Sequence, residues 1–316
     1  LLYHTEEYLE RLIHLFNKSE NEHSKVPIDR DTIIMPYTRN AVYSAAGSLL
    51  SAIDDLMLPS NHPNHIRTAF CCVRPPGHHA ERNRAMGFCF LSNAAIAAKY
   101  AQSRYNFTKV AVLDFDVHHG NGTEEGFFHD PTLFYGSTHE FGGYPNTGYE
   151  PKLRPITLSE LLEDFNLTQE NYLQNSILHP NNINKYLSVM VASENSELQD
   201  NQIKPYHRIV NRQLNTGNNS LIEFRRKWRD IVYEVIKFKP NLIIISAGFD
   251  AHKLDPIGNC HLNENDFEWA TDLVKQASNY LSSLPLHGNV PILSILEGGY
   301  NLKALSSSTL SHIQSL

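Results

Sequence analysis

Four short stretches of the chain concentrate polar side chains that could bind a metal ion or transfer protons, and each follows an apolar run typical of a buried strand. They are Arg74-Pro-Pro-Gly-His78-His79-Ala80, Asp114-Phe-Asp116-Val-His118-His119-Gly120-Asn121-Gly122, Ser246-Ala-Gly-Phe-Asp250-Ala-His252 and Glu297-Gly298-Gly299-Tyr300. Histidine and aspartate are common ligands of catalytic metals, and histidine transfers protons near neutral pH. We therefore expect the chemistry of this protein at these four positions.

The second stretch is the most informative, because Asp114, Asp116 and His118 recur at every second position. On a strand this period places all three side chains on one face. Three such groups on a buried strand are costly without a counter-charge, which a metal ion would supply. A catalytic zinc needs three protein ligands and one open position. Asp116 and His118 provide two, and Asp250 can provide the third; Fe²⁺ or Co²⁺ would suit the same ligands.

A structural interpretation competes with this one. A single histidine or aspartate at a strand end is typically a cap or a surface residue. Two His-His pairs, one of them following carboxylates at alternate positions, are much harder to explain in that way. The pattern therefore favours a metal site.

The His78-His79 pair follows a tight Pro-Pro-Gly turn, and neither residue is needed as a metal ligand. A neutral imidazole beside a metal-activated water is a suitable general base, since its ordinary pKa lies near 6.5. Asp114 and Asn121 could orient the two rings by accepting their N–H groups. Taken alone, the pair is equally compatible with a solvated turn.

Tyr300 follows two glycines, which permit a close backbone approach or a positive φ. A phenol on such a loop could donate a hydrogen bond to a developing oxyanion. Gly-Gly-Tyr alone is more typical of an ordinary turn, so this signal gains weight only from the other three stretches.

The elements that must position these residues alternate between helices and strands. This order predicts a three-layer α/β/α fold around a mostly parallel sheet, with ligands at the carboxyl ends of the strands. Periodicity predicts helices over 3–16, 40–58, 92–102, 220–238 and 265–281, and strands over 68–73, 109–115, 132–135, 242–246 and 290–296.

Composition excludes several other classes of protein. The 316 residues are 41% hydrophobic and 19% charged, which is typical of a globular chain. A net charge of −7 gives no support for a general nucleic-acid binder, and we expect no sequence-specific nucleic-acid binding. The four cysteines form no CxxC pair, and no apolar run is long enough to cross a membrane.

The chain is predicted to form one catalytic domain over residues 1–316. Residues 150–206 are polar and lack a clear strand, so we expect a surface insertion there, with short helices over 158–165 and 169–178. Because the chain begins with Leu, we expect it to be trimmed at its N-terminus.

At this point the motifs resemble those of zinc-dependent histone deacetylases of the class II type, in the arginase/deacetylase superfamily. The matching stretches begin at His4, Val73, Val110, Phe134, Leu242 and Ile295, and read HTEEYLERL, VRPPGHHAERNRAMGFCFLSNAAIAA, VAVLDFDVHHGNGTEEGFF, FYGSTHEF, LIIISAGFDAH and ILEGGYNL. Together they span most of the chain outside the insertion.

The resemblance implies a role for each matching position. The zinc ligands would be Asp116, His118 and Asp250. The general base and acid would be His79, with His78 as its electrostatic partner bonded to Asp114. The oxyanion would be held by the zinc and Tyr300. The lysine channel would be lined by Gly87, Phe88, Tyr144 and, at its rim, Ile257.

The resemblance also implies structural potassium. An inner site would involve Asp114, Asp116, His118, Ser137 and Thr138, and a second site would involve Phe127, Asp130 and Leu133. The expected substrates are acetyl-lysine proteins or peptides, such as histone tails, met in the cytoplasm or nucleus, or in a host nucleus if the source is bacterial.

Three other functions stay open. Polyamine-preferring relatives carry Glu where this chain has Ile257, which makes an acetylpolyamine amidohydrolase the nearest alternative. An arginase-like dimanganese hydrolase would need a further carboxylate pair in place of His-His-Gly-Asn. A binding module without catalysis should have lost Tyr300 or a metal ligand, and this chain keeps them all.

Overall fold

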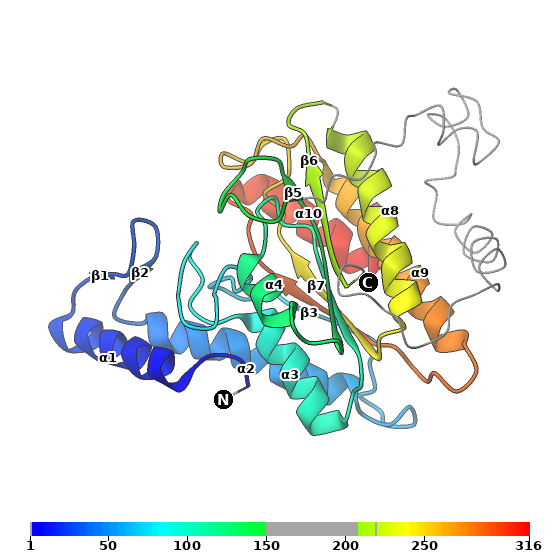
Figure 1. The fold of residues 1–316 in the computed structure, drawn as a ribbon, viewed down its shortest axis with the longest axis horizontal. Helices are drawn as coiled ribbons and strands as arrows, with labels where there is room; N and C mark the ends of the chain where they lie inside the picture. Colours follow the sequence, from blue (N-terminus) through cyan, green and yellow to red (C-terminus); the bar gives the residue numbers. More distant parts are fainter. Residues whose placement is uncertain (1, 150–207, 219) are drawn as a thin grey trace.

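The structure is a computed structural model that describes residues 2–149, 208–218 and 220–316. Its centre is a parallel sheet of six strands in the order β3-β8-β7-β4-β5-β6 (Figure 1). These strands are β3 (Thr68–Cys71), β4 (Val110–Asp114), β5 (Leu133–Glu140), β6 (Ile209–Leu214), β7 (Leu242–Ala247) and β8 (Ile292–Leu296). A small antiparallel pair, β1 (Val26–Pro27) and β2 (Ile33–Ile34), lies apart from the sheet.

Helices cover both faces of the sheet, which confirms the predicted α/β/α fold. They are α1 (Glu6–Glu22), α2 (Thr38–Leu56), α3 (Asn93–Tyr105), α4 (Asn121–Phe127), α8 (Ser220–Phe238), α9 (Glu264–Ser283) and α10 (Leu302–Ser315). Successive residues of β4 serve opposite faces: Val110 and Val112 pack with α2 and α3, whereas Ala111 and Leu113 pack with α8 and α9. A strand buried on both faces must be apolar throughout, as β4 is before Asp114.

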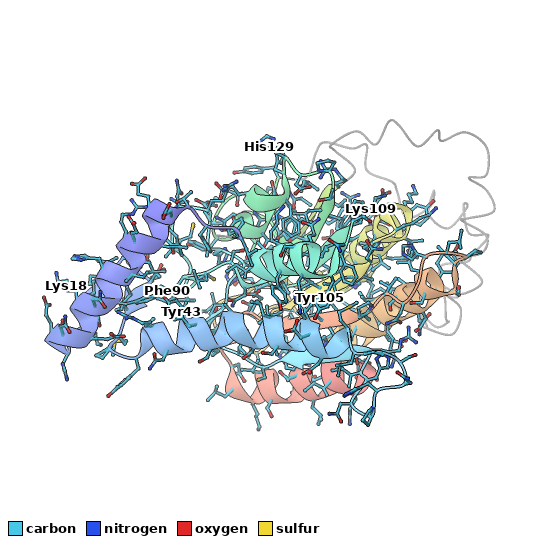
Figure 2. The ribbon with its side chains drawn as sticks, turned by 90° about the horizontal axis from the view of Figure 1, so that it is seen from below. Lys18, Tyr43, Phe90, Tyr105, Lys109 and His129 are labelled. Atoms are coloured by element: carbon cyan, nitrogen blue, oxygen red, sulfur yellow. The ribbon has the colours of Figure 1, made fainter. Side chains whose placement is uncertain are left out.

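A third apolar cluster joins α1 and the β1–β2 pair to the body of the protein. Phe16 of α1 is fully buried and meets the rings of Tyr43 on α2 and Phe90, each with its centroid 6.2 Å away. Figure 2 places Tyr43 and Phe90 where α1, marked by Lys18, approaches α2. This cluster includes Ala85, Phe90 and Leu91, so it packs against the segment that follows the first histidine pair.

The predicted elements mostly recur with shifted ends. The helix predicted over 220–238 matches α8, and the strand predicted over 242–246 matches β7. The prediction ended β5 at Tyr135, but the strand continues through Ser137, Thr138 and His139, which are polar and nevertheless buried. It also missed β1, β2, α4, β6 and α10.

The predicted insertion over 150–206, with its helices over 158–165 and 169–178, lies outside the described residues. Among the helices of the described ranges, none has the combination of length and apolar character that a bilayer crossing requires.

A buried histidine on α10 ties this helix to the sheet and to α9. The ring of His312 is fully buried, with Nδ1 2.6 Å from Thr271 Oγ1 and Nε2 2.7 Å from Ser294 Oγ. Because the Thr271 hydroxyl donates to the Phe267 carbonyl, Nδ1 of His312 must be the donor to Thr271. Burial disfavours the charged ring, so Nε2 of His312 carries no proton and accepts from the Ser294 hydroxyl.

Burial lowers the pKa of His312 to about 3, far below the ordinary 6.5. Between these values the unfolded chain binds a proton that the native protein does not, so stability is complete above pH 6.5 and falls on acidification toward pH 3. We expect this one residue to remove about 2 kcal/mol of unfolding free energy between pH 7 and pH 5, measured by urea denaturation.

His312→Gln provides the control, because an amide can make the same two hydrogen bonds without titrating. We expect its unfolding free energy to depend less on pH than that of the wild type over this range. An identical acid sensitivity in both proteins would contradict the assignment.

Candidate active site

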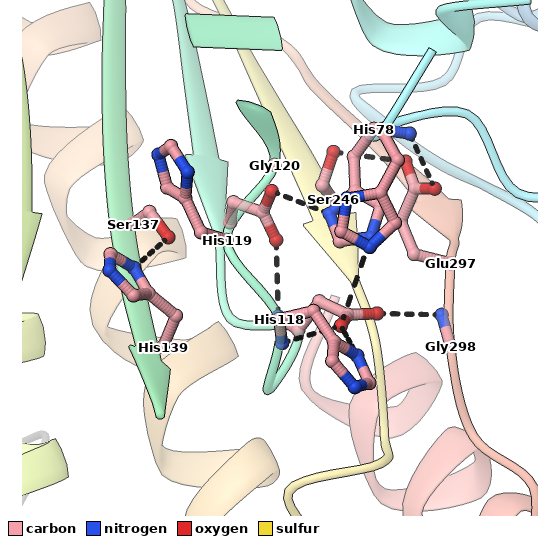
Figure 3. Close-up of polar contacts among 12 residues, drawn as sticks. His78, His118, His119, Gly120, Ser137, His139, Ser246, Glu297 and Gly298 are labelled. Atoms are coloured by element: carbon pink, nitrogen blue, oxygen red, sulfur yellow. Dashed lines mark hydrogen bonds and ion pairs between the residues drawn. The ribbon is translucent and has the colours of Figure 1, made fainter. Parts of the chain in front are cut away.

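The four polar stretches meet at one edge of the sheet. They follow β3, β4, β7 and β8, and in the sheet order β3-β8-β7-β4 these strands are consecutive neighbours. Because all are parallel, their carboxyl ends lie on the same edge, and the side chains that follow converge there (Figure 3). The site is therefore assembled from segments up to 220 residues apart, as Gly77 N and Glu297 Oε2 illustrate at 2.7 Å.

Asp116, His118 and Asp250 form a compact group of potential metal ligands. Their nearest ligand atoms all lie within 4.8 Å of one another. Nδ1 of His118 is 3.0 Å from Asp116 Oδ1 and 3.2 Å from Asp250 Oδ2. Two carboxylates and one imidazole facing a common point form a donor set suited to a catalytic zinc.

Backbone groups fix the orientation of both carboxylates. The N–H of Val117 donates to Asp250 Oδ1 at 2.9 Å, and the N–H of Gly298 donates to Asp116 Oδ2 at 2.8 Å. Asp250 Oδ2 is buried and accepts no hydrogen bond, although His118 Nδ1 lies 3.2 Å away. Since a buried carboxylate oxygen normally has a partner, this atom fits a metal ligand.

Glycines leave room for this group. A Cβ atom at Gly248 would lie 2.0 Å from Asp116 Oδ2, and one at Gly298 would lie 2.1 Å from Asp250 Oδ2. Any larger residue at either position would displace a carboxylate.

The prediction that Asp114, Asp116 and His118 lie on one face of a strand is wrong. β4 ends at Asp114, so the strand period does not extend to Asp116 and His118. Asp114 faces His78 and the hydroxyl of Tyr135, each at 3.1 Å, rather than the ligand group. The turn after Asp114 thus separates two carboxylates: Asp114 orients a histidine, and Asp116 faces His118 and Asp250.

The charges of this group also fit a bound cation. Burial opposes the charged form of His118, but hydrogen bonds to Asp116 and Asp250 outweigh it and raise its pKa to about 11. Burial and the charge of Asp116 raise the pKa of Asp250 to about 6. The two carboxylates that favour a charged His118 would favour a bound cation in the same way.

The two histidines of the first pair have opposite charge states. His78 is buried between Asp116 and Asp114, whose charges outweigh the effect of burial and raise its pKa to about 10. Burial and the nearby His78 and His118 hold the pKa of His79 well below its usual value. His78 is thus the cationic member of the pair, and His79 is neutral and able to accept a proton.

His79 is held in one tautomer by Asn121. Its Nδ1 lies 2.8 Å from Asn121 Oδ1, and the Asn121 amide in turn donates to Glu81 Oε1 at 2.7 Å. Glu81 fixes which end of the amide faces the ring, so Nδ1 of His79 donates and Nε2 is left as the proton acceptor.

The ring of Tyr300 lies edge-on to that of Phe88, with their centroids 5.8 Å apart. Burial and the charges of Asp250 and Asp116 raise the pKa of its phenol, which keeps the hydroxyl protonated and able to donate. The N–H of Tyr300 donates to Asp255 Oδ2 at 2.7 Å, while Asp255 Oδ1 accepts from Ile257 at 3.0 Å. One carboxylate thus fixes both Tyr300 and the predicted rim residue.

The predicted channel residues surround these groups. The ring of Tyr144 lies edge-on to His79 with centroids 5.0 Å apart, and Phe88 and Tyr144 are 37% and 40% exposed. Partial exposure of two rings next to a buried histidine is expected at the mouth of a channel. Gly87 has φ +56°, and a Cβ there would lie 2.4 Å from His79 Cδ2.

The two predicted potassium sites differ. At the inner one, Asp114 and Ser137 are register partners on β4 and β5, and Thr138 Oγ1 is buried without a hydrogen-bond partner. At the second one, the carbonyls of Asp130 and Leu133 already accept hydrogen bonds from the guanidinium of Arg208. This second position therefore does not fit a bound potassium ion, because a protein cation binds two of its three carbonyls and the third, that of Phe127, accepts the N–H of Asp130.

Sequence reasoning missed several residues that support the site. Glu297 was read only as part of a glycine-rich loop, yet it is fully buried against the His78 turn. His119 bonds Glu124 at 2.7 Å and Thr147 at 2.7 Å, which links the floor of the site to the loop carrying Tyr144. In the sequence, Glu297 and His119 show only that they are polar and close to the motifs, which does not reveal the residues they contact.

The α/β/α fold and its group of potential metal ligands are those expected of a metal-dependent hydrolase, and comparison with known proteins identifies the family. The model of the histone deacetylase domain matches residues 1–316, so the chain belongs to the histone deacetylase domain family. It is 33% identical over 311 residues to type-2 histone deacetylase 1 of Dictyostelium discoideum, a match that covers 91% of this chain and 20% of that protein.

Two further matches agree. Histone deacetylase 6 of Caenorhabditis elegans is 31% identical over 315 residues, which cover 97% of this chain and 27% of that protein. The crystal structure of the HDA15 HD domain superposes with a TM-score of 0.70 at 26% identity, covering 99% of this chain and 70% of that one. The chain thus spans about a fifth to a quarter of the two named deacetylases.

Removal of one candidate ligand tests the metal site. Asp250→Ala should leave two ligands, and we expect a purified variant to contain less than about a tenth of the zinc bound by the wild type, since three protein ligands are the usual minimum. Zinc per chain is measured by plasma mass spectrometry. Asp266→Asn, which alters an equally buried carboxylate on α9, should keep its zinc; stoichiometric zinc in Asp250→Ala would contradict the ligand assignment.

Proposed function

We propose that this chain hydrolyses acetyl or other acyl groups from lysine side chains of proteins such as histones, and that it uses one Zn²⁺ per chain. The observation that carries this proposal is the convergence of Asp116, His118 and Asp250 beside a neutral His79 and a protonated Tyr300. Family membership supports the same reaction.

Asp116, His118 and Asp250 would hold the zinc, which when bound polarises the amide carbonyl and lowers the pKa of a water molecule. His79 accepts a proton from the attacking water at Nε2, because Nδ1 is engaged with Asn121. His78, held by Asp114, supplies positive charge next to the developing oxyanion. His79 then returns its proton to the departing lysine amine.

Tyr300 completes the oxyanion site as a neutral donor. The amide carbonyl gains negative charge as the tetrahedral intermediate forms, and a phenol placed beforehand stabilises this charge without reorganisation. The charges that raise the pKa of Tyr300 are those of the metal ligands themselves, so the donor lies near the group that would bind the metal.

The channel favours a substrate whose long apolar side chain lies between the walls and whose charged or polar part stays outside. Phe88 and Tyr144 provide aromatic walls for the lysine methylenes. Ile257 at the rim is 45% exposed and offers no counter-charge to a polyamine. We therefore favour acyl-lysine in peptides over acetylspermidine, and we infer one catalytic domain with an inner potassium site that includes Asp114, Asp116, His118, Ser137 and Thr138.

A direct assay tests the function and its nearest alternative. We expect the zinc-loaded protein to release acetate from an acetyl-lysine peptide, to lose this activity with a chelator and to regain it with Zn²⁺. The value of kcat/KM for acetylspermidine should be at least about tenfold lower, because one unmatched charge at the rim removes about 1.4 kcal/mol or more. A reversed preference would favour the polyamine alternative, and peptide binding without hydrolysis would favour a binding module.

Tyr300→Phe tests the oxyanion donor. We expect kcat to fall by about 10²–10³-fold, while KM and zinc content change little, because the lost hydrogen bond forms fully only in the transition state. Steady-state kinetics on the acetyl-lysine peptide measure the effect. The matched variant Tyr43→Phe, on α2, should retain wild-type turnover; wild-type kcat in Tyr300→Phe would refute the role.

A further inference from the structure

The turn between α4 and β5 is bound by a guanidinium. Arg208, which directly precedes β6, donates from Nη1 to the carbonyls of Asp130 and Leu133, the latter at 3.0 Å. Its own carbonyl accepts the N–H of Tyr135 at 2.8 Å, so the residue is anchored in the sheet. Arg208 is only 5% exposed. A buried guanidinium on two carbonyls is a fixed structural contact rather than a surface ion pair.

A second protein cation lies at the same turn. Lys99 of α3 binds the carboxylate of Asp130 through Oδ2, while Thr132 donates its backbone N–H to Oδ1 at 2.9 Å. The charge of Asp130 is therefore already paired, and its carbonyl is already bound by Arg208. A potassium ion on these carbonyls would lie within a few ångströms of a guanidinium, and like charges at such distances repel strongly.

We propose that Arg208 is a built-in cation that takes the place of the second structural potassium ion in this chain. The carbonyls of Asp130 and Leu133 bind the guanidinium of Arg208, a cation that belongs to the chain itself. The stability of this turn should therefore not depend on the potassium concentration. This inference concerns ion binding and stability, so it stands or falls independently of the deacetylase activity.

Counting bound ions gives the first test. Rubidium serves as the potassium probe, and bound Rb⁺ per chain is measured by plasma mass spectrometry after equilibrium dialysis at constant ionic strength. We expect at most one Rb⁺ in the wild type. Arg208→Met removes the guanidinium and keeps an unbranched side chain, and it should bind one more Rb⁺ than the wild type. Two ions in the wild type would overturn the proposal.

Thermal unfolding gives the second test. In choline chloride, Arg208→Met should unfold about 2–10 °C below the wild type, since two buried carbonyls lose their donor. Replacing choline by potassium should recover part of this loss, so the potassium-dependent rise in Tm should be larger in the variant. Arg212→Met, on the same strand, is the control and should respond to potassium as the wild type does.

Equal potassium responses in Arg208→Met and wild type would also overturn the proposal. If Arg208→Met does not fold, the ion count on the wild-type protein decides alone. Arg208→Lys, which keeps a positive charge, should show the smaller potassium response of the wild type.

An independent observation concerns Glu297, the fully buried carboxylate behind the histidine pair. Its Oε2 accepts the N–H of Gly77 at 2.7 Å and that of His78 at 3.2 Å, and its Oε1 accepts the Ser246 hydroxyl at 3.1 Å (Figure 3). The next residue, Gly298, donates its N–H to Asp116. The segment after β8 thus touches both the metal ligands and the backbone of the turn that carries His79.

From these contacts we infer that Glu297 is a positioning residue, which sets the distance of His79 from the metal ligands by holding the His78 turn against β7 and β8. This inference rests on the proposed function. The carboxylate does not touch the reacting atoms, and its partners are the backbone N–H groups of Gly77 and His78. Moving the turn by about 1 Å would misplace the base, and such a shift can reduce the rate by about 10²-fold.

Two conservative variants separate position from charge. Glu297→Asp keeps the charge but withdraws the carboxylate by one carbon–carbon bond, about 1.5 Å. We expect kcat for the acetyl-lysine peptide to fall by about 10–100-fold while KM and zinc content stay within about twofold. Glu297→Gln keeps the length and an acceptor oxygen, and it should retain more of kcat than Glu297→Asp. Asp266→Asn is the control and should match the wild type.

Several outcomes would overturn the inference. These are wild-type kcat in Glu297→Asp, an increase in KM alone, or a lower kcat in Glu297→Gln than in Glu297→Asp. If the wild type itself does not hydrolyse acetyl-lysine, the proposed function fails instead, which keeps the two failures distinct.

Discussion

The structure depends on the placement of two carboxylates, Asp116 and Asp250, in a buried position where they face the same imidazole nitrogen. Like charges at this depth repel unless a cation lies between them. Backbone N–H groups orient both carboxylates: those of Gly298 and His118 donate to Asp116, and that of Val117 donates to Asp250. Gly248 and Gly298 lie so close to these carboxylates that any side chain at either position would displace a carboxylate oxygen. The fold itself thus creates a buried position, between Asp116 and Asp250, that favours a positive charge.

The protein meets the same electrostatic demand in three ways. At the ligand group, a metal ion would supply the charge. At Asp114, His78 supplies it as a cation, and its charge keeps the neighbouring His79 neutral. At the turn between α4 and β5, the guanidinium of Arg208 supplies it. Two adjacent histidines thereby acquire opposite charge states, which general base catalysis beside a stabilised oxyanion requires.

Proximity within the site comes from strand order. The segment after β8 contains Glu297, Gly298 and Tyr300, which respectively touch the His78 turn, Asp116 and Asp255. This is possible because β8 lies between β3 and β7 in the sheet. A shift of this segment would move the base, a ligand and the oxyanion donor together. Gly298 lets the carboxylates approach this segment closely, because a Cβ atom there would lie 2.1 Å from Asp250 Oδ2 and 2.6 Å from Asp116 Oδ2.

Much of the fold and the composition of the site could be predicted from local patterns. Alternating helical and apolar runs indicate a parallel sheet, and the motifs around Asp116, Asp250 and Tyr300 indicate the chemistry. Such patterns depend on residues close together in the chain. Short elements such as β6 and α4 were missed because their apolar runs are too brief or too mixed to show a period.

The sequence by itself determined which residue types could bind a metal, transfer a proton and stabilise an oxyanion, because these properties belong to the side chains. Only the tertiary structure decided which carboxylate faces the ligand group and which orients His78, that Glu297 binds the backbone of the His78 turn, and that Arg208 binds the carbonyls of Asp130 and Leu133. These outcomes arise from contacts between residues far apart in the chain, 36 positions between His78 and Asp114 and 75 between Arg208 and Leu133, and a local pattern carries no information about them.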